Sequence, residues 1–223
     1  MTYVLRVAAW IAALVALPVV LGSMAGGIGV ATGAGLAVVA VVYAWLWLPR
    51  IAHRVFEAGY YANAAKRYRL LQWLAISASR QRAARLSRAG CAVALGDVAR
   101  AERLLAAIDR DALAAAERAV WLNNRACAAL AAGGDPHAAL ALADEAGALR
   151  PDVPALQHTR GQALLAVGRV DDAIAVLDGM RAAGELPTRL EADRCRDLAR
   201  AWRAKGETAY AEDYQLRADG IGR

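Results

Sequence analysis

The feature that most limits the fold of this 223-residue chain is a stretch of 43 residues, between Arg6 and Arg50, without Asp, Glu, Lys or Arg. A bilayer core of about 30 Å is crossed by roughly 20 apolar residues in a helix, so two crossings fit. The middle third of the stretch holds six glycines: Gly22, Gly26, Gly27, Gly29, Gly33 and Gly35. Because glycine eases chain reversal, we predict a transmembrane helical hairpin in residues 1–49. Its spans cover about 4–22 and 28–48 and turn at Gly22–Gly27.

Aromatic and small residues agree with a hairpin. Trp and Tyr prefer the membrane–water boundary, and they stand at both ends of the stretch: Tyr3, Trp10, Tyr43, Trp45 and Trp47. A hairpin brings both ends to the same side of the membrane. Gly29 and Gly33 have GxxxG spacing, which permits close approach of the second helix to the first.

A cleaved secretory signal is an alternative for the first span. Arg6 is followed by an apolar run and by the small residues Ser23-Met24-Ala25, a pattern typical of a signal peptide and its cleavage site. Cleavage would leave one span and would not change the side on which the polar part lies.

Basic residues gather directly after the second span. Residues 50–88 contain nine Arg or Lys and one acid, Glu57, whereas residues 91–223 contain 17 basic and 20 acidic residues. Positive charge beside a span marks the cytoplasmic side, so the polar part is expected in the cytoplasm. The first basic residues are expected to contact lipid headgroups: Arg50, Arg54, Lys66, Arg67 and Arg69. Since the excess of positive charge is confined to this region, we expect no nucleic-acid partner.

A repeat runs through the polar part. Glycines recur at spacings of 38, 34 and 38 residues: Gly96, Gly134, Gly168 and Gly206. Alanine stands five residues after each: Ala101, Ala139, Ala173 and Ala211. A small residue stands seven before each: Ala89, Cys127, Gly161 and Ala199. Close helix crossings need small side chains on both partners, so the period predicts stacked antiparallel helix pairs. A shorter match to the same pattern follows Gly59, with alanine again five residues later at Ala64. We expect Pro49 to end the second span, Asp135-Pro136 to start one helix, and Thr188 with Glu191 to cap another.

These residues resemble the tetratricopeptide repeat (TPR) family. Its large, small and proline positions are matched within 120–153 by Trp121, Cys127, Leu130, Gly134, Ala139, Ala146 and Pro151. The resemblance covers residues 50–219 and implies an all-α solenoid in residues 50–223, with about four helix pairs after a leading half-repeat. Arg88, Arg160 and Gln215 stand where that family usually has apolar residues. Two spans before TPR units are also similar in layout to the HemY-type inner-membrane proteins.

The sequence contains no recognisable catalytic or cofactor motif. The three histidines have no i,i+4 partner among them, and the three cysteines fall on first helices near buried positions. No CxxC, HExxH or other metal-ligand spacing occurs. The hypothesis is therefore a protein that is not an enzyme, with no cofactor and no metal.

Binding of a protein remains as the main hypothesis. The resemblance places the concave side of the solenoid near Asn124, His158, Gln162, Arg196, Arg200 and Arg203. The three arginines share one helix face by spacing, and they suit an acidic peptide or a C-terminal carboxylate. The alternative is a solvated face on which these arginines pair with Asp193 and Asp197.

Two functions stay open. The first is a TPR scaffold or adaptor, anchored in the bacterial inner membrane by a multi-pass hairpin, that binds a protein partner at the cytoplasmic face. The second is a structural subunit or assembly factor of a larger membrane complex that acts through its transmembrane hairpin. The bacterial assignment follows from Arg-rich usage with only two lysines, Lys66 and Lys205, which indicates a GC-rich genome.

Overall fold

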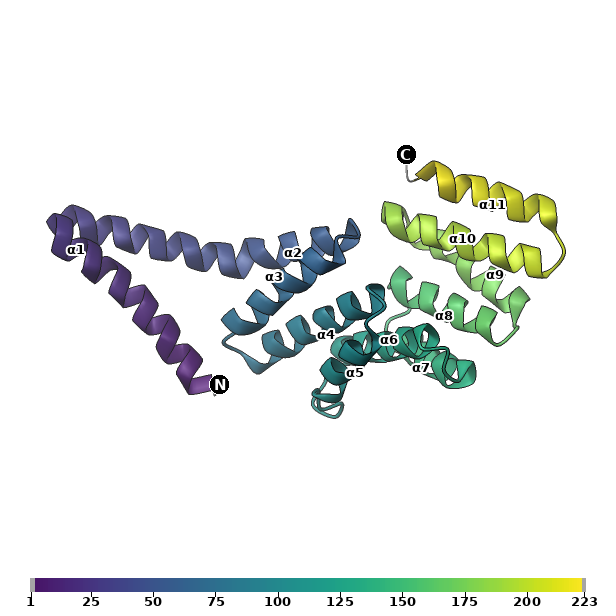
Figure 1. Ribbon diagram of the computed structural model, residues 1–223, viewed down its shortest axis with the longest axis horizontal. Helices are drawn as coiled ribbons and strands as arrows, with labels where there is room; N and C mark the ends of the chain where they lie inside the picture. The colour runs from purple at the N-terminus through teal and green to yellow at the C-terminus, as the bar shows by residue number, and fades with distance from the viewer. Residues whose placement is uncertain (1–2, 222–223) are drawn as a thin grey trace.

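The computed structural model describes residues 3–221, with side chains for 12–182 and 184–221, and this part is helical without a strand. A long bent helix precedes a curved row of antiparallel helix pairs (Figure 1). The side chains of Tyr3 and Trp10, which we placed at the membrane surface, lie outside the described part. The all-α solenoid predicted from the repeat is confirmed.

Helix α1 (Tyr3–Val42) reverses at the predicted glycine-rich segment. Ala25 (φ −135°) and Gly26 (φ +59°) leave helical geometry, and the two arms diverge from this point (Figure 1). Near the turn the arms touch: a Cβ on Gly29 would lie 1.9 Å from the carbonyl oxygen of Leu21, and one on Gly33 would lie 2.6 Å from Cα of Pro18. The GxxxG spacing therefore lies at a close contact between the arms.

The second arm continues into the solenoid without a break, contrary to the expectation that Pro49 ends it. Val42 leads into a π-helical turn, η1 (Tyr43–Trp47), and then into α2 (Leu48–Glu57). Proline has no N–H for the helical ladder, and the wider π turn immediately before it accommodates this loss. By length and composition alone, one helix among the described residues, Ala12–Glu57, is apolar enough to cross a membrane.

Five antiparallel pairs follow along the chain, and the leading half-repeat is itself a complete pair. The first is α2 with α3 (Tyr61–Leu74). The other pairs are α4 (Ala78–Ala94) with α5 (Val98–Ala106), α6 (Ala115–Ala131) with α7 (Pro136–Leu149), α8 (Pro154–Ala166) with α9 (Val170–Gly179), and α10 (Thr188–Ala204) with α11 (Thr208–Ile221). A short 3₁₀ turn, η2 (Met180–Ala183), follows α9.

The chain reverses within each pair at a glycine of positive φ. Gly59, Gly96, Gly168 and Gly206 have φ between +75° and +82°, a region that costs other residues energy. In the third pair the left-handed residue is Gly133 (φ +64°) rather than the predicted Gly134, because this turn is one residue longer.

The small residues of the repeat form the seam between the helices of each pair. Ala101, Ala139, Ala173 and Ala211 are at most 1% exposed. Opposite them, Ala89 and Ala199 are fully buried, and a Cβ on Gly161 would lie 2.6 Å from the end of the Leu177 side chain. The predicted positions of close crossing are therefore confirmed, except that Cys127 is half-buried and lines the groove, where its Sγ lies 3.3 Å from Oγ1 of Thr159 on α8.

Helix starts agree with the sequence at one predicted site and differ at another. The Asp135 carboxylate caps α7 by accepting from the N–H of His137 at 2.9 Å. Thr188 does not cap α10: Pro187 takes the cap position, and Glu191 pairs with Arg194 at 2.7 Å. The T-x-x-E prediction is wrong because buried Arg194, only 2% exposed, engages this carboxylate.

The seam can be tested with neighbouring alanines on α7. Ala139 is fully buried, whereas Ala138 is exposed. We expect Ala139→Leu to lower the free energy of unfolding by about 1–3 kcal/mol through overpacking. Ala138→Leu should change it by less than about 0.5 kcal/mol. Urea unfolding of the full chain in detergent, followed by circular dichroism, measures both; equal effects of the two substitutions would contradict the packing described.

Candidate functional site

The first helices of the repeats line a groove on the concave side of the solenoid. Helices α4, α6, α8 and α10 pack side by side in this order. They enclose a groove of about 520 Å³, which α2 and α3 border at one end. Its polar lining comes mainly from Asn123, Asn124, His158, Thr159, Gln162, Arg189, Asp193, Arg196, Asp197 and Arg200.

The groove is closed at one end by contact between the first and last repeats. The guanidinium of Arg189, at the start of α10, lies 5.1 Å from the ring centre of Tyr61 on α3. Its Nη1 would lie 2.5 Å from a Cβ on Gly59, and the φ of +82° at Gly59 independently favours glycine there. Tyr61 also packs edge-on against Phe56 of α2 at 5.1 Å. The solenoid thus curves far enough for its ends to meet.

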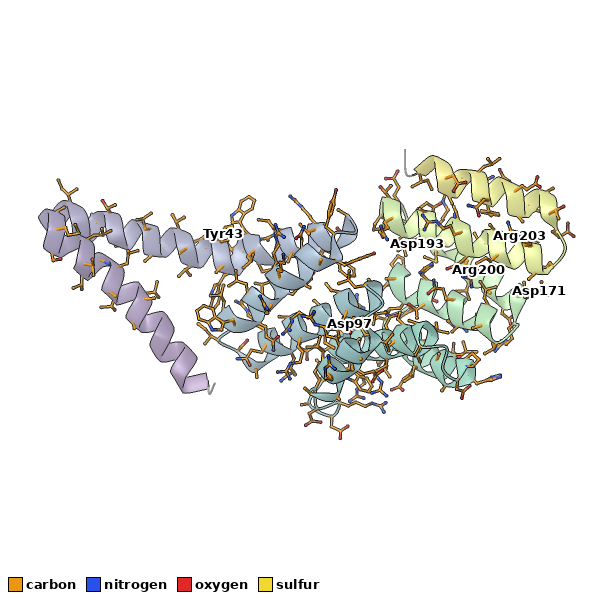
Figure 2. The ribbon with its side chains drawn as sticks, in the orientation of Figure 1. Tyr43, Asp97, Asp171, Asp193, Arg200 and Arg203 are labelled. Atoms are coloured by element: carbon orange, nitrogen blue, oxygen red, sulfur yellow. The ribbon has the colours of Figure 1, made fainter. Side chains whose placement is uncertain are left out.

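Five of the six predicted groove residues line this cavity. These are Asn124, His158, Gln162, Arg196 and Arg200. Arg203 does not: it is exposed nearer the α10–α11 turn (Figure 2). Arg189 lines the groove although the sequence analysis did not single it out. Its spacing of four from Asp193, and of eleven from Arg200, places it on the same helix face.

Asp197 is the centre of the polar network. Its Oδ2 accepts from Nε2 of Gln162 at 2.8 Å, and Arg200 lies 3.2 Å from its Oδ1. His158 Nε2 is 3.0 Å from Oδ2 but lacks the alignment of a hydrogen bond. Burial disfavours the charged carboxylate, but the contacts of His158, Gln162 and Arg200 outweigh it and lower the pKa of Asp197. The network joins α8 to α10.

Asn124 lines the groove and also links two helices of the stack. Its side-chain amide donates to the carbonyl oxygen of Leu86 at 3.0 Å, and its own exposure is 7%. A Cβ on Gly90 would lie 3.3 Å from its Oδ1, so α4 and α6 approach closely here. Asn124 therefore fixes the spacing of the two helices that form one wall.

Two buried polar atoms in the groove have no hydrogen-bond partner among the described residues. They are Oδ1 of Asn123 and Nε2 of His158, and the second of them is already in contact with the Asp197 carboxylate at 3.0 Å. Most buried polar atoms in proteins are hydrogen-bonded, so Oδ1 of Asn123 is suited to a bound hydrogen-bond donor. They belong to α6 and α8, one repeat apart.

The groove arginines are only partly neutralised. Arg196 pairs with Asp193, and Arg200 with Asp197. Arg189 contacts an aromatic ring. Three arginines against two aspartates leave one net positive charge on this wall. The pairing that we weighed as the alternative for this face is present, and the wall still carries an excess of positive charge.

The predicted lipid-contacting residues lie on α2 and α3. Arg50, Arg54, Lys66 and Arg69 are exposed, and Arg67 is half-buried. Arg50 donates to the carbonyl oxygen of Leu46 at 2.6 Å, and Arg67 to that of Asn63 at 3.1 Å. Arg50 and Arg54 lie near the end of the continuous helix Ala12–Glu57, beyond its uncharged stretch, and the other three residues lie on α3.

The cysteines are poor nucleophiles. Burial raises the pKa of the Cys91 thiol to about 11, and burial also raises the pKa values of Cys127 and Cys195. Among the described residues, no group of three or more His, Cys, Asp and Glu side chains is arranged to hold a metal ion.

The Asp197 network predicts a pH-dependent contribution to stability. Because its pKa is lowered on folding, the contribution is full above the unfolded pKa of about 4 and is lost as the pH falls through the folded value. We expect Asp197→Asn to cost about 1–3 kcal/mol at pH 7 and less at pH 3, which lies below the unfolded pKa. Asp193→Asn, which removes a more exposed pair, should cost less than about 1 kcal/mol. Urea unfolding at both pH values measures this; a loss that does not change with pH would refute the assignment.

Comparisons with known proteins agree with this architecture. Residues 130–192, from the end of α6 to the start of α10, match the tetratricopeptide repeat family. A similar crystal structure is that of a variant Podosopora anserina protein. That protein is described as a kinesin light chain with nearly identical TPR-like repeats. It is 22% identical, with a TM-score of 0.51, over 78% of this chain and 92% of that one.

A second crystal structure of those Podosopora anserina repeats is 23% identical, with a TM-score of 0.49, over 78% of this chain and 93% of that one. No curated protein matches the chain significantly. The family match and the first of these structures together show that the chain carries TPR-like repeats in an α-solenoid.

Proposed function

We propose that this protein is a scaffold or adaptor that binds a protein partner in its concave groove. TPR repeats generally mediate protein–protein interaction, which supports this role. The observation that carries the proposal is the groove of about 520 Å³, in which Asn123 presents a buried oxygen without a hydrogen-bond partner and Arg196 and Arg200 present exposed guanidinium groups. A peptide backbone offers both donors and acceptors to such atoms.

The charge of the groove favours an acidic segment or a C-terminal carboxylate. Arg196 and Arg200 are both exposed and both on the groove wall. A partner carboxylate would share their guanidinium groups with Asp193 and Asp197, and arginine offers five donors for such sharing. Arg203 takes no part in this proposal, because it lies outside the groove.

We further propose that the hairpin anchors the protein in the bacterial inner membrane, with the solenoid in the cytoplasm. The support is the exposed apolar surface of both arms, which includes Val19, Val38 and Val39, each more than 60% exposed. Contiguous apolar surface of this extent is unusual on a soluble monomer. The basic residues of α2 and α3 follow at the end of this surface, where anionic headgroups attract them.

A structural subunit of a larger membrane complex is the second candidate. The observation in its favour is a hollow of about 430 Å³ on the second arm, lined by Val38, Val39, Val42, Tyr43, Trp47 and Ile51. A transmembrane helix of another protein fits such an apolar surface. Exchange of residues 1–48 for an unrelated hairpin separates the two candidates: retained function supports the adaptor, and lost function supports the membrane subunit.

The groove can be tested with a photo-reactive amino acid at Ala155, an exposed residue of its lining. We expect crosslinks in cells from this position but not from exposed Ala138 on α7. With the crosslinked partner purified, Arg196→Gln combined with Arg200→Gln should weaken binding about tenfold or more, because charge-assisted contacts are lost.

Arg203→Gln is the control for either single groove variant, Arg196→Gln or Arg200→Gln, since it removes one positive charge from α10 outside the groove. It should leave the dissociation constant within about twofold. Equal losses for Arg203 and for the groove arginines would reject the groove as the binding site.

Membrane orientation is tested with reporter fusions at the C-terminus. We expect a fusion to a fluorescent protein that folds only in the cytoplasm to be bright, and an alkaline phosphatase fusion to be inactive, since positive charge retains flanking segments in the cytoplasm. Reversal of Arg50, Arg54, Lys66, Arg67 and Arg69 to Glu should lower the fluorescence. An active phosphatase fusion of the native sequence would disprove the orientation.

A further inference from the structure

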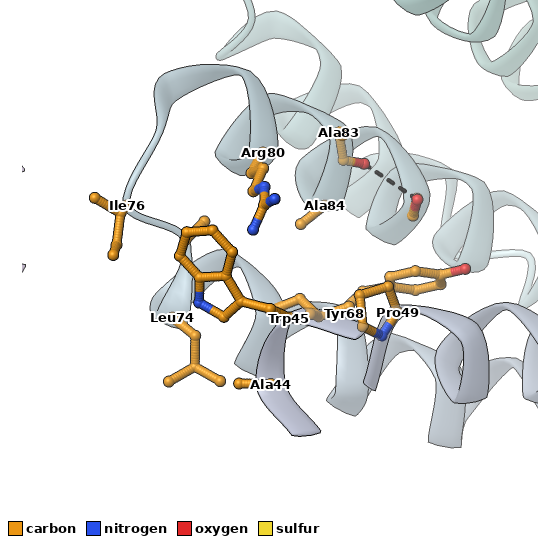
Figure 3. Close-up of a pocket in the computed structure, with 12 residues that line it drawn as sticks. Ala44, Trp45, Pro49, Tyr68, Leu74, Ile76, Arg80, Ala83 and Ala84 are labelled. Atoms are coloured by element: carbon orange, nitrogen blue, oxygen red, sulfur yellow. Dashed lines mark hydrogen bonds between the residues drawn. The ribbon is translucent and has the colours of Figure 1, made fainter. Parts of the chain in front are cut away.

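A second cavity lies where the apolar helix joins the solenoid. It has a volume of about 340 Å³ and opens between η1, α3 and α4 (Figure 3). Apolar side chains form most of its lining: Ala44, Trp45, Pro49, Tyr68, Leu71, Leu74, Ala75, Ile76, Ala83 and Ala84. Arg80 and Ser87 are its other two lining residues. The volume and the lining of this cavity are typical of sites that bind small molecules or lipids. Such sites are mostly apolar and contain a few polar groups that orient the ligand.

Arg80 is the cationic group of this cavity. Its guanidinium carbon lies 3.9 Å above the ring centre of Trp45, and Figure 3 shows the two side chains facing each other. Stacking uses the flat face of the guanidinium and leaves its in-plane N–H donors available. No carboxylate of the described residues forms an ion pair with Arg80.

The other basic side chains of α4 are engaged elsewhere. Arg82 pairs with Glu117 at 3.5 Å, Arg85 donates to the carbonyl oxygen of Ala107 at 2.6 Å, and Arg88 donates to Gln72. Arg80 therefore differs from its neighbours in facing an apolar cavity with its charge uncompensated by an acid. This combination suits a ligand with an apolar body and an anionic end.

The start of α4 adds to the attraction for an anion. The helix begins at Ala78 behind Ser77, whose Oγ accepts from the N–H of Arg80 at 3.3 Å. The first turn contains no acidic residue, so the positive end of the helix dipole is not compensated there. The dipole and the Arg80 charge act on the same side of the cavity.

We propose that this cavity binds one acyl chain of an anionic phospholipid, whose phosphate is held by Arg80. The proposal rests on the membrane anchoring proposed above. Trp45 and Ala44, which line the cavity, belong to the same continuous helix as the exposed apolar arm. A lipid of the adjacent leaflet can therefore enter without leaving an apolar surface, while a guanidinium suits its phosphate.

The test is native mass spectrometry of the full chain in a non-ionic detergent, titrated with two lipids of identical dioleoyl chains. We expect phosphatidylglycerol to bind about tenfold more tightly than phosphatidylcholine, because only the former carries net negative charge. Arg80→Gln should abolish this preference. Arg103→Gln, which removes the same charge from an exposed site on α5, should preserve it.

A second variant tests the acyl chain separately. Ala83 is exposed and lines the cavity, so Ala83→Phe fills space at little risk to folding. It should weaken binding of both lipids about tenfold. Preserved preference in Arg80→Gln, preserved affinity in Ala83→Phe, or displacement of the lipid by inorganic phosphate alone at the same concentration would each overturn the proposal.

Failure of this site and failure of the proposed function give different results. The titration requires neither an intact membrane nor a protein partner. A chain that binds phosphatidylglycerol through Arg80, yet is found outside the membrane fraction of cells, contradicts the anchoring alone. A chain that remains in the membrane fraction and binds both lipids equally contradicts the lipid site alone.

Discussion

Close crossing of helices at alanine and glycine is the constraint on which the rest of the structure depends. Each pair meets at a residue such as Ala139 or Ala173, which has no exposed surface. Helix axes approach most closely where side chains are small, and successive pairs then stack with a constant turn. That turn brings α10 round to α3, where Arg189 meets Tyr61. The groove exists because the stack curves this far.

The continuous helix from the apolar arm into α2 joins the proposed membrane anchor to this curved stack. The π turn at Tyr43–Trp47 lies between the two parts and presents Trp45 to the lipid-sized cavity. Phe56, at the far end of α2, lines the groove with Tyr61. One continuous helix thus contributes to both cavities, so the proposed lipid site and the proposed protein site share an element.

Local patterns predicted much of this fold, and long-range contacts account for what they missed. The glycine and alanine period located the helix pairs, because each pair is a local unit with its own turn and crossing. The prediction that Pro49 ends the second span was wrong, because a π turn compensates for the missing N–H of proline. The prediction that Thr188 and Glu191 cap α10 was wrong, because Glu191 pairs with the buried Arg194. The Arg189–Tyr61 contact joins residues more than a hundred positions apart, and only the accumulated curvature of the stack brings them together. Arg200 lines the groove and Arg203 does not, because Arg203 lies at the C-terminal end of α10, beyond the groove.

The most direct test of this account is the distance between the first pair and the start of α10. Spin labels at Tyr60 and Thr188, introduced after replacement of the native cysteines by alanine, report this distance by pulsed electron paramagnetic resonance. A curved, closed stack predicts one short and narrow distance distribution, which lengthens on substitution of Ala139 by a bulky residue. A long or broad distribution in the otherwise native chain would show that the ends do not meet and that the groove described here does not form.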